Sequence, residues 1–144
     1  ERGGGSNSNV KAPPVIVLHG MLGQSRNFAT WAKNLSRSLS CQRKIFIVDQ
    51  RNHGNSGHSD GMRYTDMVDD LLEFYEQQGI DEAILVGHSM GGKTAMALAL
   101  LHPQKVAGLV VMDIAPVPYG PFDGSNWREN VQIIEALQKL EVEK

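Results

Sequence analysis

The chain alternates between short, wholly apolar runs and longer segments of mixed polarity. Runs of this length are typical of strands that are buried on both faces of a parallel sheet. The runs are Val15–Leu18, Ile45–Val48, Ala83–Val86 and Val106–Met112. A glycine or an aspartate stands within two residues after each run. The pattern therefore predicts four buried strands that end in loops.

Between the runs, apolar residues return at every third or fourth position, which predicts amphipathic helices. The clearest series is Tyr64, Met67, Val68, Leu71, Leu72 and Tyr75, and Gly79 is a suitable helix stop after it. Two other series are Phe28, Trp31, Leu35 and Leu39, and Val131, Ile134, Leu137 and Leu140. A further helix should end at His102–Pro103. We place Trp31, Tyr64 and Met67 on faces that pack against the core.

Strands that alternate with helices imply an α/β fold, with a mostly parallel sheet and helices on both faces. Residues 1–14 are rich in Gly, Ser, Asn and Pro and predict a flexible lead-in, and residues 15–118 hold the alternating elements. Residues 119–144 contain a turn-rich stretch and one helix, with no strand after it. The 144 residues make room for one domain. Its sheet would end at an exposed apolar edge, which complete proteins avoid.

Composition and charge exclude several classes of partner. The apolar fraction of 41% and the charged fraction of 21% are ordinary for globular domains. A formal net charge of −2, with no run of Lys or Arg, provides no footprint for nucleic acid or an anionic membrane. No apolar stretch approaches the roughly 18 residues of a membrane span. The single cysteine, Cys41, has no partner for an internal disulfide.

One short motif predicts a chemical function. Residues 87–91, GHSMG, match G-x-S-x-G directly after an apolar run and directly before a helix. A serine on so tight a strand-to-helix turn projects its hydroxyl from the carboxyl edge of the sheet. Small residues are needed two positions before and after it, because backbone crowds the turn. The helix also points its N-terminal amides toward charge that develops on a substrate. The motif therefore favours Ser89 as a nucleophile.

A second motif overlaps the first and predicts a different function. Residues 87–94 also satisfy G-x-x-x-x-G-K-[ST], the P-loop that binds nucleotide phosphates. The apolar run before Asp113 resembles the strand that holds magnesium in such proteins. Against this alternative, Ser89 falls where a P-loop needs only backbone. In addition, two complete β-α units precede the loop, and the motifs after the first two strands stay unexplained.

Four segments resemble the α/β-hydrolase superfamily, and within it the abhydrolase-domain proteins and their bacterial esterase relatives. They are HGMLG at 19–23, DQRNHGNS at 49–56, VGHSMGGKTAM at 86–96 and MDIAPVPY at 112–119. The similarity covers roughly residues 13–120 and implies an α/β-hydrolase fold, present here as its N-terminal half. Residues 119–144 would then begin a truncated cap. In that branch Lys and Thr ordinarily follow the glycines of the motif, so the P-loop match requires no nucleotide.

The resemblance implies roles for individual residues. Ser89 aligns with the nucleophile, and Asp113 with the acid of a catalytic triad. The backbone N–H groups of Met21 and Met90 align with an oxyanion hole. Many α/β-hydrolases take the acid from a later strand, and the alternative for Asp113 is a strand-end aspartate that caps a local turn. The implied reaction is hydrolysis of an ester or related acyl bond through an acyl-serine, with no cofactor and no metal.

The base of that mechanism is missing from the sequence. In this fold the triad residues follow the order serine, acid, histidine, yet all the histidines (19, 53, 58, 88 and 102) precede Asp113. One interpretation is a fragment of a longer enzyme whose later part supplies the histidine. The other is a short product that does not catalyse, such as a non-catalytic binder or an inactive isoform. We expect the first, and little ester hydrolysis by this chain alone.

The remaining polar residues have structural interpretations. We expect His19 to hold the oxyanion loop through local hydrogen bonds. His88 should be structural, because adjacent residues on a sharp turn point apart. Local bonds or solvent contacts are expected for His53, His58 and His102. Asp49 and Arg51 are expected to organise the loop in which they stand.

The resemblance implies a small-molecule acyl ester or thioester as the substrate, while the charge pattern predicts no nucleic acid partner. The single cysteine fits a reducing, intracellular compartment. The resemblance adds the mitochondrion as an option in a eukaryote. No pattern in the sequence specifies an oligomeric state.

Overall fold

A four-stranded parallel sheet forms the centre of the computed structural model, which describes residues 12–120 and 127–139. The strands are β1 (Val15–Leu18), β2 (Ile45–Val48), β3 (Ala83–His88) and β4 (Val106–Met112). They are arranged in the order β2-β1-β3-β4, and every neighbouring pair is parallel. The four strands predicted from the apolar runs are thus present, and the α/β fold class is confirmed.

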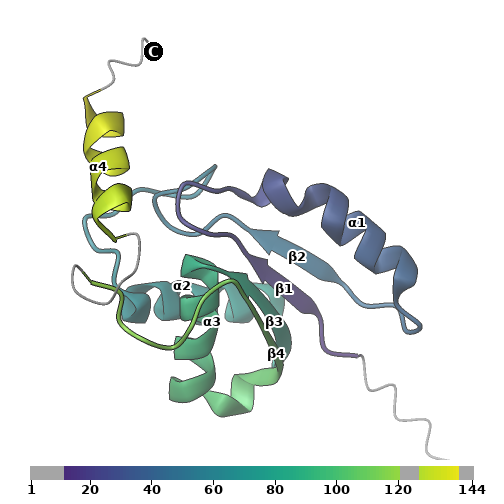
Figure 1. Cartoon of the computed structure of the whole chain (residues 1–144). Coiled ribbons are helices and arrows are strands. Elements are labelled where there is room, and N and C mark those ends of the chain that lie inside the picture. The colour runs from purple at the N-terminus through teal and green to yellow at the C-terminus, as the bar shows by residue number, and fades with distance from the viewer. Residues whose placement is uncertain (1–11, 121–126, 140–144) are drawn as a thin grey trace, which may run out of the picture.

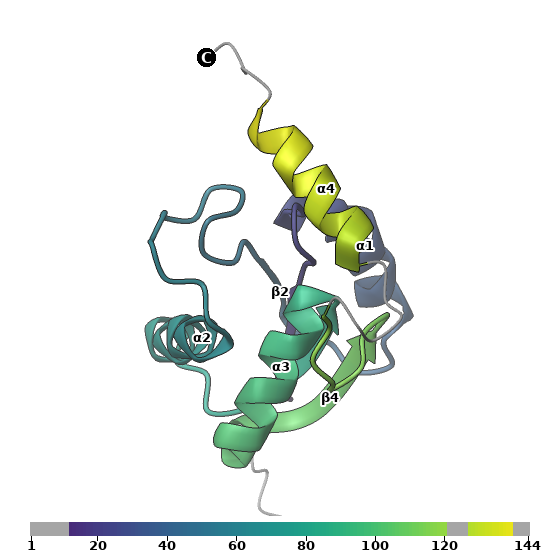
Figure 2. The same ribbon diagram turned by 60° about the vertical axis from the view of Figure 1, so that its left-hand side comes forward.

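Helices cover both faces of the sheet (Figures 1 and 2). α1 lies on one face, and α2 and α3 lie on the other. The α-helices are α1 (Ala29–Ser38), α2 (Tyr64–Gln78), α3 (Met90–Leu101) and α4 (Trp127–Gln138). Short 3-10 helices, η1 (Ser25–Phe28) and η2 (Pro103–Lys105), precede α1 and β4. In both views α4 stands away from the sheet, on the side of the strands' carboxyl ends.

The core consists of two apolar clusters, one on each face of the sheet. The larger cluster joins Ile16 and Leu85 of the sheet to Val68 of α2 and Leu98 of α3, and these side chains are 0–1% exposed. The smaller cluster, around Val17, lies under η1 and α1. Successive residues of a strand point to opposite faces, so β1 contributes to both clusters. The continuous apolar runs are therefore explained by burial on two sides.

Two of the three side chains that we placed on core faces are not buried. Trp31 is 39% exposed and Tyr64 is 40% exposed, whereas Met67 is only 2% exposed. Trp31 lies at the surface of α1, edge-to-face with Phe28, and Ala32 is the buried residue of this helix. Tyr64 begins α2 and precedes the turns that pack against the sheet. Helical periodicity alone does not distinguish the margin of a packed face from its centre.

Among the described residues, β4 forms one edge of the sheet. Leu109 and Val110 of this strand are 41% and 47% exposed, so the predicted apolar edge is present. No described helix combines the length and the hydropathy that a membrane span requires. Of the predicted lead-in, residues 1–11 lie outside the described residues, as do 121–126 and 140–144 of the predicted cap.

Tyr75 connects α2 to the turn before β4. Its side chain is 1% exposed, and its hydroxyl donates a hydrogen bond to the carbonyl of Lys105 at 3.2 Å. Burial raises the pKa of Tyr75 to about 12. Because the pKa of an unfolded tyrosine is about 10, the folded chain keeps this proton to higher pH. The stability that this group contributes is therefore present below about pH 10 and is lost between about pH 10 and 12.

We expect Tyr75→Phe to lower the free energy of unfolding at pH 7 by about 1 kcal/mol, because one buried hydrogen bond is lost. The variant should also lose less stability than the wild type between about pH 10 and 12. Denaturant titrations across this range measure both effects. Tyr64→Phe, at an exposed position, serves as the control and should change stability at pH 7 by less than about 0.5 kcal/mol. Equal slopes with pH in Tyr75→Phe and the wild type would contradict the prediction.

Candidate active site

Ser89 occupies the turn between β3 and α3, at the carboxyl end of the sheet. Its backbone has φ 50° and ψ −115°, a conformation that is strained for a residue with a side chain. Hydrogen bonds on both sides hold the turn. The amide of Ser89 donates to the carbonyl of Met112 at 3.0 Å, and the amide of Gly91 donates to the carbonyl of His19 at 3.1 Å. The turn is thereby tied to the ends of β4 and β1.

The glycines around Ser89 stand where no side chain fits. A Cβ on Gly87 would overlap the backbone of Gly91, and a Cβ on Gly91 would overlap the carbonyl of Leu18. Both obstacles are backbone atoms, which cannot move aside as the end of a flexible side chain can. The requirement for small residues two positions before and after the serine therefore has a direct structural cause.

The two predicted oxyanion amides lie on neighbouring parts of the sheet's carboxyl edge. Met21 belongs to the loop after β1, which is a tight turn closed by a hydrogen bond from Gly23 to Gly20 (3.0 Å). Met90 is the first residue of α3, so its amide has no acceptor within the helix. Because β1 and β3 are adjacent and parallel, their carboxyl ends bring these two residues to the same edge.

His19 lies fully buried beneath this loop, and both of its ring nitrogens are hydrogen-bonded. Nε2 accepts from the amide of Gln50 (3.1 Å), so the proton is on Nδ1, which donates to the carbonyl of Gly20 (2.8 Å). Burial lowers the pKa of His19 and so favours this neutral ring. The Gln50 side chain donates to the carbonyl of His19 (2.6 Å). The hydrogen bond to Gly20 is the local one that the sequence predicted, whereas the bonds with Gln50 join His19 to the loop after β2.

Asp113 follows β4, with φ 54° and a side chain that is 90% exposed. Its carboxylate oxygen Oδ2 lies 3.8 Å from Nε2 of His88. Sequence reasoning missed this contact, although strand register explains it, because His88 pairs with Met112 across β3 and β4. It also missed that Nε2 of His53 accepts from the amide of Leu22 (3.2 Å), 31 residues away. Both contacts depend on which strands are neighbours.

Lys93 and Thr94, which complete the P-loop match, are engaged within the protein. Nζ of Lys93 donates to the carbonyl of Val117 (2.7 Å) and lies 4.4 Å from the ring centroid of Tyr119. Thr94 is fully buried, and its hydroxyl lies 3.1 Å from Oε1 of Gln50. In a P-loop these two side chains face phosphate and magnesium. Here they join α3 to two other segments, which weighs against a nucleotide site.

The loop after β2 is organised by its own charged residues, as predicted. Asp49 accepts from the amides of Ser25 and Asn55. Burial opposes its ionisation, but these hydrogen bonds hold the pKa of Asp49 below its usual value. Arg51 makes two hydrogen bonds of 2.6 Å to the carboxylate of Asp70 on α2. The bidentate pair fixes the loop against that helix.

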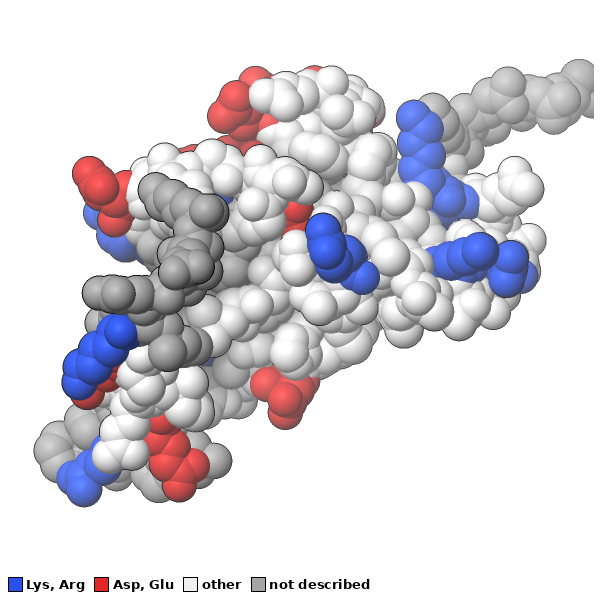
Figure 3. All heavy atoms as spheres, turned by 90° about the horizontal axis from the view of Figure 1, so that it is seen from above, with Lys and Arg blue, Asp and Glu red and all other residues white. Residues whose placement is uncertain are grey.

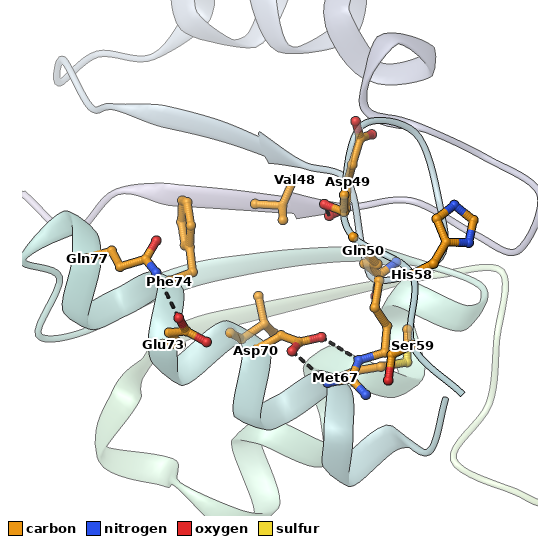
Figure 4. A pocket seen from close by; sticks show the side chains of 14 residues that line it. Val48, Asp49, Gln50, His58, Ser59, Met67, Asp70, Glu73, Phe74 and Gln77 are labelled. Atoms are coloured by element: carbon orange, nitrogen blue, oxygen red, sulfur yellow. Dashed lines mark hydrogen bonds and ion pairs between the residues drawn. The ribbon is translucent and has the colours of Figure 1, made fainter. Parts of the chain in front are cut away.

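A cavity of about 510 Å³ opens beside this loop, between the end of β2 and α2 (Figure 4). Its lining combines apolar side chains such as Val48 and Phe74 with polar ones such as His58 and Asp70. The close-up shows the carboxylate of Asp70 in its paired position. None of the four predicted site residues lines this cavity. It is therefore separate from the turn at Ser89.

Charge is dispersed over the face drawn in Figure 3. Acidic and basic side chains stand there in small separate groups, with broad uncharged surface between them. This face thus offers no basic patch of the kind that binds nucleic acid. Within residues 12–120 and 127–139, no group of three or more His, Cys, Asp or Glu side chains is placed to hold a metal ion.

Comparisons with a family model, with known sequences and with solved structures all match this chain to hydrolases. The family model for the alpha/beta hydrolase fold matches residues 13–138. The chain is 46% identical over 126 residues to a mouse sn-1-specific diacylglycerol lipase, ABHD11, a match that covers 88% of this chain and 40% of the mouse protein. It is 42% identical over 106 residues to the Escherichia coli esterase YbfF, covering 74% of this chain and 40% of that protein.

A solved structure of a marine microorganism esterase superposes with a TM-score of 0.83 at 40% identity, over 90% of this chain and 48% of that one. The chain therefore spans less than half the length of each of these relatives.

We expect Gly91→Ala to lower the free energy of unfolding by about 3 kcal/mol or more, because its Cβ would overlap the carbonyls of Leu18 and His19. Gly57→Ala is the matched control, since nothing lies within 4 Å of a Cβ at that position. It should change stability by less than about 0.5 kcal/mol. Chemical denaturation of both variants measures the difference, and wild-type stability of Gly91→Ala would refute the close approach.

Proposed function

Since this chain belongs to the alpha/beta hydrolase fold family, we propose that it supplies the nucleophile-bearing part of a serine hydrolase. The reaction would be cleavage of an ester or a related acyl bond. The turn at Ser89 supports this proposal most directly. Its φ of 50° is strained, and the flanking glycines meet backbone atoms where any side chain would stand. Strain of this kind persists where function requires an exposed, fixed hydroxyl.

In the proposed reaction, the Ser89 hydroxyl attacks the substrate carbonyl and loses its proton to a base. The carbonyl oxygen becomes an oxyanion, which the amides of Met21 and Met90 stabilise, each by about 3–4 kcal/mol. The leaving group departs with a proton, and an acyl-serine remains. Water then attacks the acyl-serine and releases the acid product. These steps use only side chains, backbone amides and water.

We assign the triad acid to Asp113, which follows β4 next to the serine turn and keeps its carboxylate exposed. An exposed carboxylate is accessible to a histidine from another segment, which it would orient and stabilise in the protonated form. Every histidine of this chain precedes Asp113, and His19 is already committed to hydrogen bonds in its loop. We therefore assign the base to a histidine in the part of the relatives' length that this chain does not span.

The substrate class is taken from the relatives at the level that they share. The mouse relative is named as an sn-1-specific diacylglycerol lipase, and the Escherichia coli relative and the marine microorganism protein are named as esterases. For this chain we propose a small-molecule acyl ester or thioester.

A fluorophosphonate probe tests the proposal, because it forms a covalent bond with an activated serine. We expect a version that continues along the reading frame to a length like that of the relatives to be labelled at Ser89. Ser89→Ala should abolish this labelling. Ser36→Ala, which removes an exposed helix hydroxyl, is the control and should leave the labelling unchanged. The 144-residue chain should be labelled only slightly above background, because it lacks the assigned base.

The alternative outcomes separate the two functions that the sequence allowed. Labelling of the short chain at the rate of the long one would show that the base lies within these residues. A folded long version that is not labelled, but binds a nucleotide in a manner that Lys93→Met abolishes, would replace the hydrolase proposal with a P-loop function.

A further inference from the structure

The loop that bears Met21 is held in place by few of its own side chains. Met21 is 55% exposed and Leu22 is 69% exposed, so neither anchors the loop in the core. Leu22 also has a φ of 61°, a left-handed conformation that costs energy for a branched side chain. The position of this loop therefore depends on hydrogen bonds to its backbone.

One of these hydrogen bonds comes from a histidine of another segment. Nε2 of His53 accepts from the amide of Leu22 at 3.2 Å, and Nδ1 lies 2.9 Å from the carbonyl of Arg51. An amide only donates and a carbonyl only accepts, so the ring must be neutral, with its proton on Nδ1. Only this tautomer makes both hydrogen bonds.

His53 is itself fixed by its surroundings. Its amide donates to the carbonyl of Gln50, and its carbonyl accepts from the amide of Ser56, both at 3.1 Å. The ring centroid lies 5.1 Å from that of His19, whose ring is buried beneath the same loop. The backbone of His53 is therefore held in the loop after β2, with the ring placed against the amide of Leu22.

The two histidines hold the backbone on either side of Met21. His19 donates to the carbonyl of Gly20 (2.8 Å), and His53 accepts from the amide of Leu22 (3.2 Å). We propose that His53 is a positioning residue that fixes the amide of Met21, the oxyanion donor, through its hydrogen bond to Leu22. This inference rests on the proposed function, because the role of the Met21 amide as an oxyanion donor belongs to that proposal. It assigns no contact between His53 and the substrate. An oxyanion donor stabilises charge only if it is held in place before the reaction.

The wild-type chain of 144 residues provides the first test, which needs no catalysis. Long-range proton–nitrogen correlation spectra report which ring nitrogen of a histidine carries the proton. At neutral pH we expect His53 to carry it on Nδ1, and the Leu22 amide to exchange slowly with solvent. A proton on Nε2 would overturn the proposal, because that nitrogen then cannot accept from Leu22.

Variants provide the second test, through the rate at which fluorophosphonate labels Ser89 in the longer version. His53→Asn keeps a side-chain amide near the position of Nδ1 but removes the acceptor at Nε2. The longer side chain of His53→Gln carries an amide oxygen, which is an acceptor, to the position of Nε2. We expect the maximal labelling rate to fall about tenfold in His53→Asn, with an unchanged half-saturating probe concentration. His53→Gln should restore the rate to within about threefold. His58→Asn, in the same loop, is the control and should label normally.

The outcomes distinguish failure of this inference from failure of the proposed function. If the longer wild-type version is not labelled, the hydrolase proposal fails, while the tautomer of His53 in the 144-residue chain still decides whether His53 holds Leu22. If the wild type is labelled and His53→Asn matches it, only the positioning role is overturned. A rate that falls equally in His53→Asn and His53→Gln would also overturn it, because loss of packing rather than of an acceptor would then be the cause. If His53→Asn does not fold, the tautomer and the His53→Gln rate give the decision.

Discussion

The hydrogen bond from the amide of Gly91 to the carbonyl of His19, at 3.1 Å, sets the distance between α3 and the sheet. It forms only because Gly91 has no side chain, since a Cβ there would overlap the end of β1. This contact also places the serine turn, because Ser89 lies only two residues before Gly91, at the end of β3, which is paired in fixed register with β1 and β4. The loop after β1 begins at the residue that Gly91 contacts, so it lies next to the turn.

A buried polar network extends this contact to a third segment. Gln50, at the start of the loop after β2, donates to the carbonyl of His19 and accepts from the hydroxyl of Thr94 on α3. Among the described residues, no buried side-chain nitrogen or oxygen lacks a partner. A network that is fully satisfied in a low-dielectric interior is rigid, and the loss of one member leaves the others unpaired. The side chains of this network therefore hold one another in place at the carboxyl edge of the sheet.

Local sequence patterns sufficed for the strands, for most of the helix faces and for the tight turn at Ser89, because burial on two sides and backbone crowding constrain residue types directly. The prediction that Trp31 and Tyr64 are buried was wrong, because periodicity gives the direction of a helix face but not its width. The contacts of His88 with Asp113 and of His53 with Leu22 depend on the strand order β2-β1-β3-β4. That order is a property of the whole sheet, which no local pattern encodes.

The overlap of two motifs in residues 87–94 shows which part of a motif distinguishes one function from another. Both motifs need glycines where backbone segments approach closely, so the glycines do not distinguish a nucleophile turn from a P-loop. The contacts of the side chains at positions 93 and 94 do distinguish them. Lys93 reaches Val117 and Tyr119, in the segment that follows Asp113, while Thr94 reaches Gln50, which holds the loop after β1. The Lys-Thr pair that completes a P-loop pattern thus connects the two segments on either side of the serine turn, and this structural task accounts for both residues without a phosphate.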